Sequence, residues 1–349
     1  MNKTHKLLNA VRFCGVSVVL LLVSVSVMAQ VDAENKDVPV RISFRPEKET
    51  IMLGEPLYFA FEVTNLSGER LCLGIGGDYR NRFGRPESFV VRVTAEDGTV
   101  IPKPEADSFG GLIGCGLIEA GDTYTVKLFL THWATITRPG SYHVNVKRSM
   151  GFSTYDASDK RTFSMDADLN ARFTIVPADE NKMGAVINSL GSIILDINNP
   201  LADDSALALA SIQDKRVISY FAEAVRNFTG VEYCDFMKQR AIGSRAIAVL
   251  GMYDDDRAIQ ELEAVMNSTC ERVRLDVATA FGDSPHKSAI KLLLKMQDDK
   301  YWFVRLRVAQ GLKKIKSKES LAALRMLLKD DNEDVRKAAQ ESLKNKNLP

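Results

Sequence analysis

A repeat of 31 residues governs the second half of the sequence and limits what it can fold into. Positions that recur at this step are Val273-Arg274, Val304-Arg305 and Val335-Arg336, and likewise Leu262, Leu293 and Leu324. Each unit holds two helical patterns with apolar residues three and four apart. Neither helix can bury its apolar stripe alone, so adjacent units must stack. The repeat therefore predicts an α-solenoid.

The phase of the repeat sets the expected helices. They pair as 240–251 with 255–267, 271–282 with 286–297, and 302–314 with 318–329, followed by a capping helix at 333–345 and preceded by a degenerate pair at 204–212 and 214–228. An irregular insert separates the degenerate pair from the regular array.

Two segments come closest to the core D-x-x-x-x-V-R-x-x-A of the repeat: Asp299 to Ala309 and Asp330 to Ala339. They resemble HEAT repeats, in the short, lyase-type form of bacterial proteins. The resemblance implies a right-handed solenoid that contacts other proteins. For the repeated Arg we expect a structural role, a hydrogen bond to an Asp of the adjacent loop, with ligand binding as the alternative.

Residues 38–177 show an apolar period of two instead, as in Val40 to Phe44 and Tyr142 to Val146. About seven short strands separated by Gly and Pro turns indicate an antiparallel sandwich. The segments Gly54 to Leu57 and Arg138 to Val144 resemble bacterial immunoglobulin-like domains, which implies a fold and no particular function.

The fold class predicted from the sequence is therefore multidomain: an N-terminal all-β immunoglobulin-like sandwich and a C-terminal all-α HEAT-like solenoid. The expected boundaries are 1–29 for a signal peptide, 38–177 for the sandwich, 178–203 for a linker or helical transition, and 204–349 for the repeats.

The N-terminus has the pattern of an export signal. Lys3, Lys6 and Arg12 precede an uncharged, largely apolar stretch that ends in a cleavage pattern at Ala29. We expect cleavage after Ala29 and a periplasmic or extracellular location. An uncleaved anchor is the alternative, because the uncharged run approaches the length of a membrane span. No other apolar run reaches that length, so no transmembrane segment is expected after signal removal.

Four cysteines remain after the signal, two in each expected domain. This division favours Cys72–Cys115 and Cys234–Cys270 as disulfides, as suits an oxidising compartment. Four buried free thiols are the alternative.

Two groups of residues are candidate binding surfaces. A glycine-rich stretch contains Tyr79, Arg80, Arg82 and Phe83, which predict either a ligand-contacting loop or a plain flexible one. Residues 285–349 hold 16 Lys and Arg against 8 Asp and Glu, and include Lys313, Lys314, Lys316 and Lys318. That basic end favours either a solvated polar cap or contact with an acidic partner.

Motifs for catalysis, metals or cofactors are absent, and the formal net charge of +1 argues against a general polyanion binder. We expect no cofactor, no metal and no nucleic-acid partner, and the sequence leaves the oligomeric state open. The predicted function is a non-catalytic protein-binding scaffold or adaptor of the cell envelope that binds through the solenoid. The alternative is an inhibitor or ligand-binding protein acting through the sandwich loops.

Overall fold

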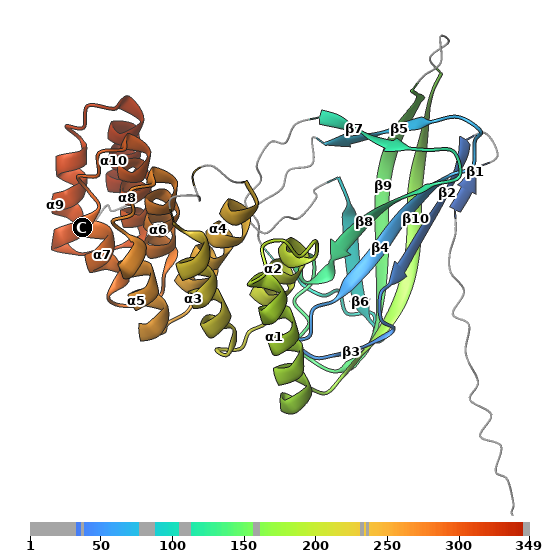
Figure 1. Cartoon of the computed structure of the whole chain (residues 1–349), viewed down its shortest axis with the longest axis horizontal. Helices are drawn as coiled ribbons and strands as arrows, with labels where there is room; N and C mark the ends of the chain where they lie inside the picture. The colour runs from blue at the N-terminus through green and yellow to red at the C-terminus, as the bar shows by residue number, and fades with distance from the viewer. Residues whose placement is uncertain are drawn as a thin grey trace, which may run out of the picture.

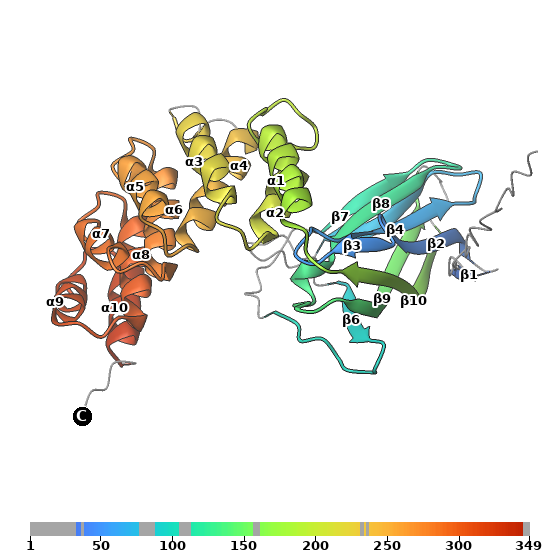
Figure 2. The ribbon, with the colours of Figure 1, turned by 90° about the horizontal axis from the view of Figure 1, so that it is seen from below.

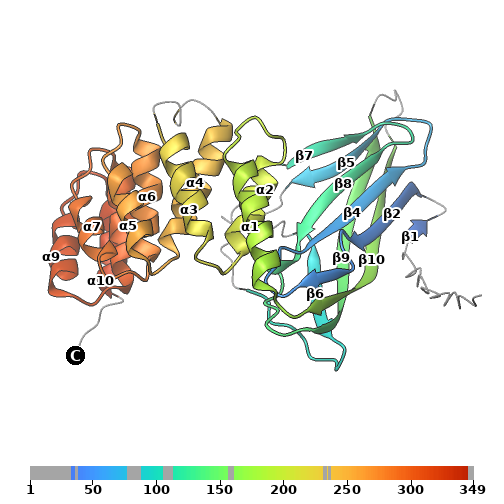
Figure 3. The same ribbon diagram turned by 60° about the horizontal axis from the view of Figure 1, so that its bottom comes forward.

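The chain divides into a β unit and a helical array in this computed structural model (Figure 1). The structure describes residues 33–35, 38–76, 88–104, 113–155, 161–230, 234 and 237–344. We call residues 33–176 the β unit and residues 180–344 the helical array. Figures 2 and 3 show the helices following one another in a row that leads away from the β unit.

The β unit contains two open sheets. The first is antiparallel and has the order β1 (Ala33–Asn35), β2 (Val38–Pro46), β4 (Tyr58–Asn65), β8 (Thr123–Phe129). The second has the order β3 (Thr50–Met52), β10 (Thr162–Val176), β9 (Gly140–Thr154), β5 (Leu71–Gly76), β7 (Ile113–Ile118), and β6 (Val90–Ala95) also pairs with β9. A 3₁₀ turn, η1 (Leu130–His132), follows β8.

Alternating apolar residues join the two sheets through one core. In β4, Phe59, Phe61 and Val63 are fully buried because every second side chain of a strand points to the same face. The ring of Phe59 meets the ring of Phe173 in β10 edge to face, with centroids 5.6 Å apart. The apolar period in the sequence therefore identified the inward faces correctly.

The predicted fold class is wrong for this half of the chain. The second sheet is mixed: β3 runs parallel to β10, with Thr50 opposite Thr174 and Met52 opposite Val176. The sheets are not closed, and Met52 belongs to the apolar core of the helical array, so an all-β immunoglobulin-like sandwich does not describe this unit. Alternating apolar residues show which face of a strand is buried. They do not show whether the neighbouring strand runs parallel or antiparallel to it.

Ten α-helices follow among the described residues. They are α1 (Glu180–Ile194), α2 (Ala202–Ser211), α3 (Val217–Phe228), α4 (Met237–Gly251), α5 (Asp256–Val265), α6 (Glu271–Asp283), α7 (Ala289–Lys295), α8 (Trp302–Gly311), α9 (Lys318–Leu327) and α10 (Glu333–Lys344), with a 3₁₀ turn η3 (Leu312–Lys314) after α8. Even-numbered helices form one layer and odd-numbered helices the other (Figure 1). No helix among the described residues is long and apolar enough to cross a membrane.

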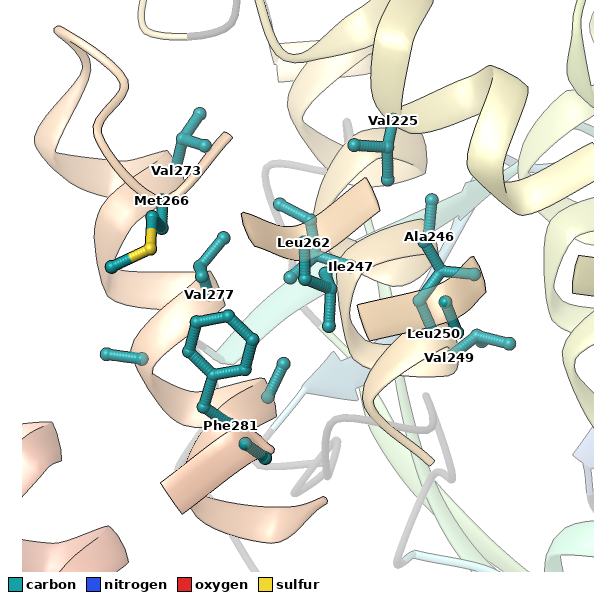
Figure 4. Packing of buried hydrophobic residues seen from close by; sticks show 14 of the residues in the cluster. Val225, Ala246, Ile247, Val249, Leu250, Leu262, Met266, Val273, Val277 and Phe281 are labelled. Atoms are coloured by element: carbon teal, nitrogen blue, oxygen red, sulfur yellow. The ribbon is translucent and has the colours of Figure 1, made fainter. Parts of the chain in front are cut away.

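The 31-residue repeat is confirmed as the rule of packing in the array. The positions Ile242, Val273, Val304 and Val335 form one buried column, and Ala246, Val277, Val308 and Ala339 form another. Figure 4 shows three of these side chains, Ala246 on α4 and Val273 and Val277 on α6, with Leu262 of α5 between the two helices. The repeat thus begins at α4, where the Arg that follows each Val is replaced by Gly243.

The first helix lies in the segment 178–203, which the sequence assigned to a linker or helical transition. Asp179 caps α1, because its carboxylate accepts hydrogen bonds at 3.0 Å from the backbone N–H groups of Asn181 and Lys182. Met183 of α1 is buried in the same core as Met52 of β3. The helical array therefore begins directly against the β unit.

Candidate binding cleft

A cleft of about 1660 Å³ lies where the helical array meets the β unit. Its helical wall comes from α2, α4 and α6, and its opposite wall from the turn at residues 52–57 and the segment 130–136 after β8. Small-molecule sites typically occupy about 300–1,000 Å³. This cleft is larger, and it contains apolar and charged side chains together.

The helical wall follows the repeat. Six residues in the α4 segment line the cleft, and the residue 31 positions after each of them, on α6, lines it too. The pairs are Ala241 and Arg272, Ser244 and Leu275, Arg245 and Asp276, Ala248 and Thr279, Val249 and Ala280, Met252 and Asp283. The same face of α4 and of α6 therefore turns toward the cleft. The next step along the repeat places Phe303, Leu306 and Arg307 on the corresponding face of α8.

A polar network holds one side of the cleft together. The hydroxyl of Tyr58 in β4 donates a hydrogen bond to the backbone carbonyl of Asp204 in α2, at 2.9 Å. The ammonium of Lys127 in β8 lies 3.7 Å from the Asp204 carboxylate and 3.3 Å from that of Glu47. Burial raises the pKa of the Tyr58 hydroxyl far above its ordinary value, and the charges of Asp204 and Glu47 add to the rise. Tyr58 thus remains a neutral donor that fixes α2 against the sheet.

Arg245 of α4 lies beside this network. Its guanidinium is half-buried, and burial lowers its pKa against the opposing effects of Asp203, Tyr58 and Asp204. Among the residues that the structure describes, Arg245 makes no ion pair within 4 Å. It therefore brings a positive charge to the cleft wall, on which Asp203 and Asp204 act from beyond ion-pair distance.

A second link lies on the other side of the cleft. The guanidinium of Arg216 donates to the carboxylate of Asp214, at 2.6 Å for Nη2, and to the carbonyl of Glu180 in α1, at 3.3 Å. These hydrogen bonds lower the pKa of the Asp214 carboxyl and raise that of Arg216. The loop after α2 is therefore tied to the start of α1, and the two helices keep a fixed distance at the cleft.

The repeated Arg residues have a structural role, as predicted. Arg274 is 6% exposed and binds Asp299 in the next unit through two hydrogen bonds, Nε–Oδ2 at 2.7 Å and Nη2–Oδ1 at 3.0 Å. Arg305 repeats this arrangement with Asp330. Arg336 donates to the backbone carbonyls of Asp330 and Asp331. The two buried Arg–Asp pairs connect adjacent units.

The sequence-predicted binding residues fall into two groups. Tyr79, Arg80, Arg82 and Phe83 lie outside the described residues, as does the expected signal at 1–29. Lys313, Lys314, Lys316 and Lys318 are all exposed around η3 and the start of α9. Lys314 lies 3.5 Å from the carboxylate of Asp283, which lines the cleft. The basic group therefore begins beside one end of the cleft.

The cysteines of the described part of the chain are paired as Cys72–Cys115, between β5 and β7, and Cys234–Cys270, with Cα atoms 5.4 and 6.1 Å apart. Glu271 lies near the second pair, and Cys, Cys and Glu together could in principle ligate a metal. Because the two sulfurs are bonded to each other, they are not metal ligands in this state.

The cleft itself was missed by reasoning from the sequence. Its opposite wall comes from turns of the β unit, whose approach to the helices no periodicity reveals. The sequence did contain one feature of the helical wall. On α4, the face opposite the buried columns carries the small or polar residues Ala241, Ser244 and Ala248.

Residues 259–344 match the family model of HEAT repeats. A search of curated proteins found no match. Solved structures that resemble the chain include an engineered protein (20% identity, 47% of this chain and 80% of that one, TM-score 0.32) and human deoxyhypusine hydroxylase in complex with glycerol (16%, 47% and 74%, 0.30). A computationally designed armadillo repeat protein for modular peptide recognition is also similar (16%, 48% and 95%, 0.28).

Proposed function

We propose that this protein is a non-catalytic scaffold or adaptor, exported to the cell envelope, that binds a protein partner through its HEAT-repeat half. The observation that carries the proposal is the cleft between the β unit and the even-numbered helices, whose helical wall repeats with the period of the HEAT units. HEAT repeats commonly serve protein–protein contact, because stacked units give a long continuous surface.

The composition of the cleft favours a polypeptide as its occupant. Apolar side chains such as Leu207, Val249 and Leu275 line it together with charged ones such as Arg245 and Asp276. A protein segment presents the same mixture of apolar and charged groups at its backbone spacing. The volume also exceeds what a small ligand fills. The links Tyr58–Asp204 and Arg216–Glu180 keep the walls in place without a ligand, which reduces the cost of ordering them on binding.

The proposed location rests on the N-terminal pattern and on the cysteine pairs, since disulfides persist in oxidising compartments. The mass of the purified protein tests it. We expect a chain that begins at Gln30, and a mass that retains Phe13 to Val27 would contradict cleaved export.

Photo-crosslinking in the host cell tests the binding function. A photoreactive amino acid replaces Ser244 in the cleft wall of α4 or, as a control, Lys291 on the exposed side of α7. We expect one dominant protein adduct from position 244 and none from position 291. The adduct is then identified by mass spectrometry, purified and titrated against the intact protein. The proposal fails if both positions give the same adducts or if the purified partner does not bind.

A further inference from the structure

We propose that the odd-numbered layer binds an anionic membrane surface through the outward sides of α7, α9 and the turns beside them. Six exposed cationic side chains lie there, and we call them the basic face: Lys287, Lys291, Lys295, Lys318, Arg325 and Lys329. The acidic residues of the same two segments, 287–298 and 318–329, are Asp298 and Glu319. The inference goes beyond the proposed function, because none of the six cationic residues lines the cleft.

The helical phase places these cations on the side opposite the buried core. On α9, Lys318 and Arg325 lie within about 20° of each other around the helix axis, and the buried Leu327 lies on the other side. On α7, Lys291 is exposed and Leu293 is buried. Because α7 and α9 are successive helices of one layer, they present their cations to the same side (Figures 1 and 3).

Most of these charges are not neutralised within the described part of the protein. Lys295 pairs with Glu263 of α5, at 3.1 Å, whereas the other five residues of the basic face make no ion pair within 4 Å among the described residues. The face ends at α5, where the exposed Asp256 stands one repeat before Lys287. Residues 287–329 of the odd-numbered layer therefore offer a continuous positive surface to a partner with negative charge.

The composition of the basic face favours a lipid surface over an acidic protein. Five of its six cations are lysines. Lysine is depleted at protein–protein interfaces, where arginine is enriched. A lysine ammonium is a compact charge on a flexible stem, which suits headgroups that move within a bilayer. Each Lys or Arg close to an anionic bilayer strengthens binding about fivefold.

Two exposed apolar side chains lie among the cations at the end of α9. Met326 is 57% exposed and follows Arg325, and Leu328 is 38% exposed and precedes Lys329. Surface segments that enter the headgroup region combine apolar side chains with Lys and Arg in this way. The helical wall of the cleft belongs to the even-numbered layer. Contact between a bilayer and the odd-numbered layer thus leaves the cleft accessible to its partner.

Sedimentation with lipid vesicles tests the proposal on the intact mature protein. The vesicles contain phosphatidylglycerol and phosphatidylcholine in equal amounts, or phosphatidylcholine alone. We expect at least about tenfold tighter binding to the anionic vesicles at low salt, and loss of this preference at about 0.5 M salt, which screens exposed charges. Equal binding to the two kinds of vesicle, or binding to neither, overturns the proposal.

A charge reversal tests the assigned face. Arg325→Glu should weaken binding to the anionic vesicles at least about tenfold. Arg92→Glu makes the same change on the exposed surface of β6 and should alter that affinity less than about twofold. Equal effects of the two variants show a response to net charge alone and overturn the assigned face. Thermal melts verify that both variants fold.

Fluorescence quenching by brominated lipid tests the apolar contact. Met326→Trp places the reporter on the basic face, and Leu201→Trp places it at an exposed apolar position before α2. We expect additional quenching over the unaltered protein for Met326→Trp and none for Leu201→Trp. Polyaspartate represents an acidic protein as the alternative occupant. If Arg325→Glu weakens the binding of polyaspartate and Met326→Trp is not quenched by vesicles, the face binds acidic protein and the membrane proposal is wrong.

The vesicle measurements require no partner in the cleft, so the two proposals fail separately. If position 244 captures a partner that binds and anionic vesicles do not bind the protein, the adaptor role stands and the membrane contact is wrong. If vesicles bind through the basic face and position 244 captures no partner, the membrane contact stands and the adaptor role is wrong.

Discussion

Gly282 of α6 and Gly311 of α8 pack backbone against backbone. A Cβ on Gly282 would lie 2.8 Å from the Cα of Gly311, and a Cβ on Gly311 would lie 2.7 Å from the Cα of Gly282. Neither position accepts a side chain without moving a helix. Consecutive units are thus packed at a distance that only glycine permits, and this contact helps to hold the even-numbered layer that forms the cleft wall.

Gly282→Ala should therefore destabilise the array by about 1–3 kcal/mol through overpacking. Helix propensity alone predicts the opposite sign, a gain of about 0.5–1 kcal/mol. Urea unfolding followed by helical circular dichroism measures the change. As a control, Gly68→Ala adds a methyl group where nothing lies within 4 Å and should change stability by less than about 0.5 kcal/mol. A stabilised Gly282→Ala variant would disprove the contact.

Leu293 tests which side of α7, a helix of the odd-numbered layer, faces the core. It is fully buried, as is Leu324 one repeat later, whereas Lys291 on the same helix is exposed. Leu293→Ala should cost about 2–5 kcal/mol through lost burial and a cavity. Lys291→Ala should cost less than about 0.5 kcal/mol. Equal losses in urea melts would show that the helix is rotated from the position described.

The Asp330–Arg305 pair predicts how stability depends on pH. Burial raises the pKa of Asp330 and is the largest single effect, but the hydrogen bonds with Arg305, the Asn332 backbone N–H and Asp331, together with the positive charge of Arg305, outweigh it and hold the folded-state pKa below the ordinary 3.8. A lowered folded pKa adds stability above the unfolded pKa, and this stability is lost as pH falls through the folded value. Unfolding free energy should thus fall below about pH 4, and Asp330→Asn should reduce that dependence at a cost of about 3–5 kcal/mol at pH 7.

Asp298→Asn, one residue before a repeat Asp and exposed, is the matched control for that measurement. It should change the unfolding free energy at pH 7 by less than about 0.5 kcal/mol. If Asp330→Asn leaves the pH dependence of unfolding unchanged, the pair does not carry the acid sensitivity assigned to it.

Peptide mapping without reductant tests the cysteine pairs. We expect one peptide pair joined through Cys72 and Cys115 and another through Cys234 and Cys270. Reduction should lower the unfolding free energy by about 2–5 kcal/mol for each pair. Full alkylation of all four thiols in unreduced protein would reject both bonds.

The helical half could be predicted from the sequence because its order is periodic. The step of 31 located α4 to α10 within a few residues, and it assigned Leu293 and Leu324 to the interior. In the β unit the alternation identified buried residues such as Phe59 and Val144. It did not reveal that β3 runs parallel to β10, because strand direction depends on a crossover between sheets and leaves no local pattern.

The cleft depends on contacts between residues far apart in the sequence, and for that reason it could not be predicted. The bond from Tyr58 to Asp204 spans 146 positions, and the side chain of Met52 enters a core made otherwise by helices. Propensity and periodicity describe neighbours along the chain, and they say nothing about which turn of a sheet meets which helix.

Blocking the cleft is the most direct test of the account. Ala248 is exposed in the cleft wall of α4, and Ala322 is exposed on α9 in the other layer. The changes Ala248→Trp and Ala322→Trp add the same bulk at these two positions, and calorimetric titration with the partner captured at position 244 measures the consequence. We predict that Ala248→Trp weakens binding at least about tenfold while Ala322→Trp leaves the affinity unchanged. Undiminished affinity in a correctly folded Ala248→Trp variant would contradict the claim that the partner occupies this cleft.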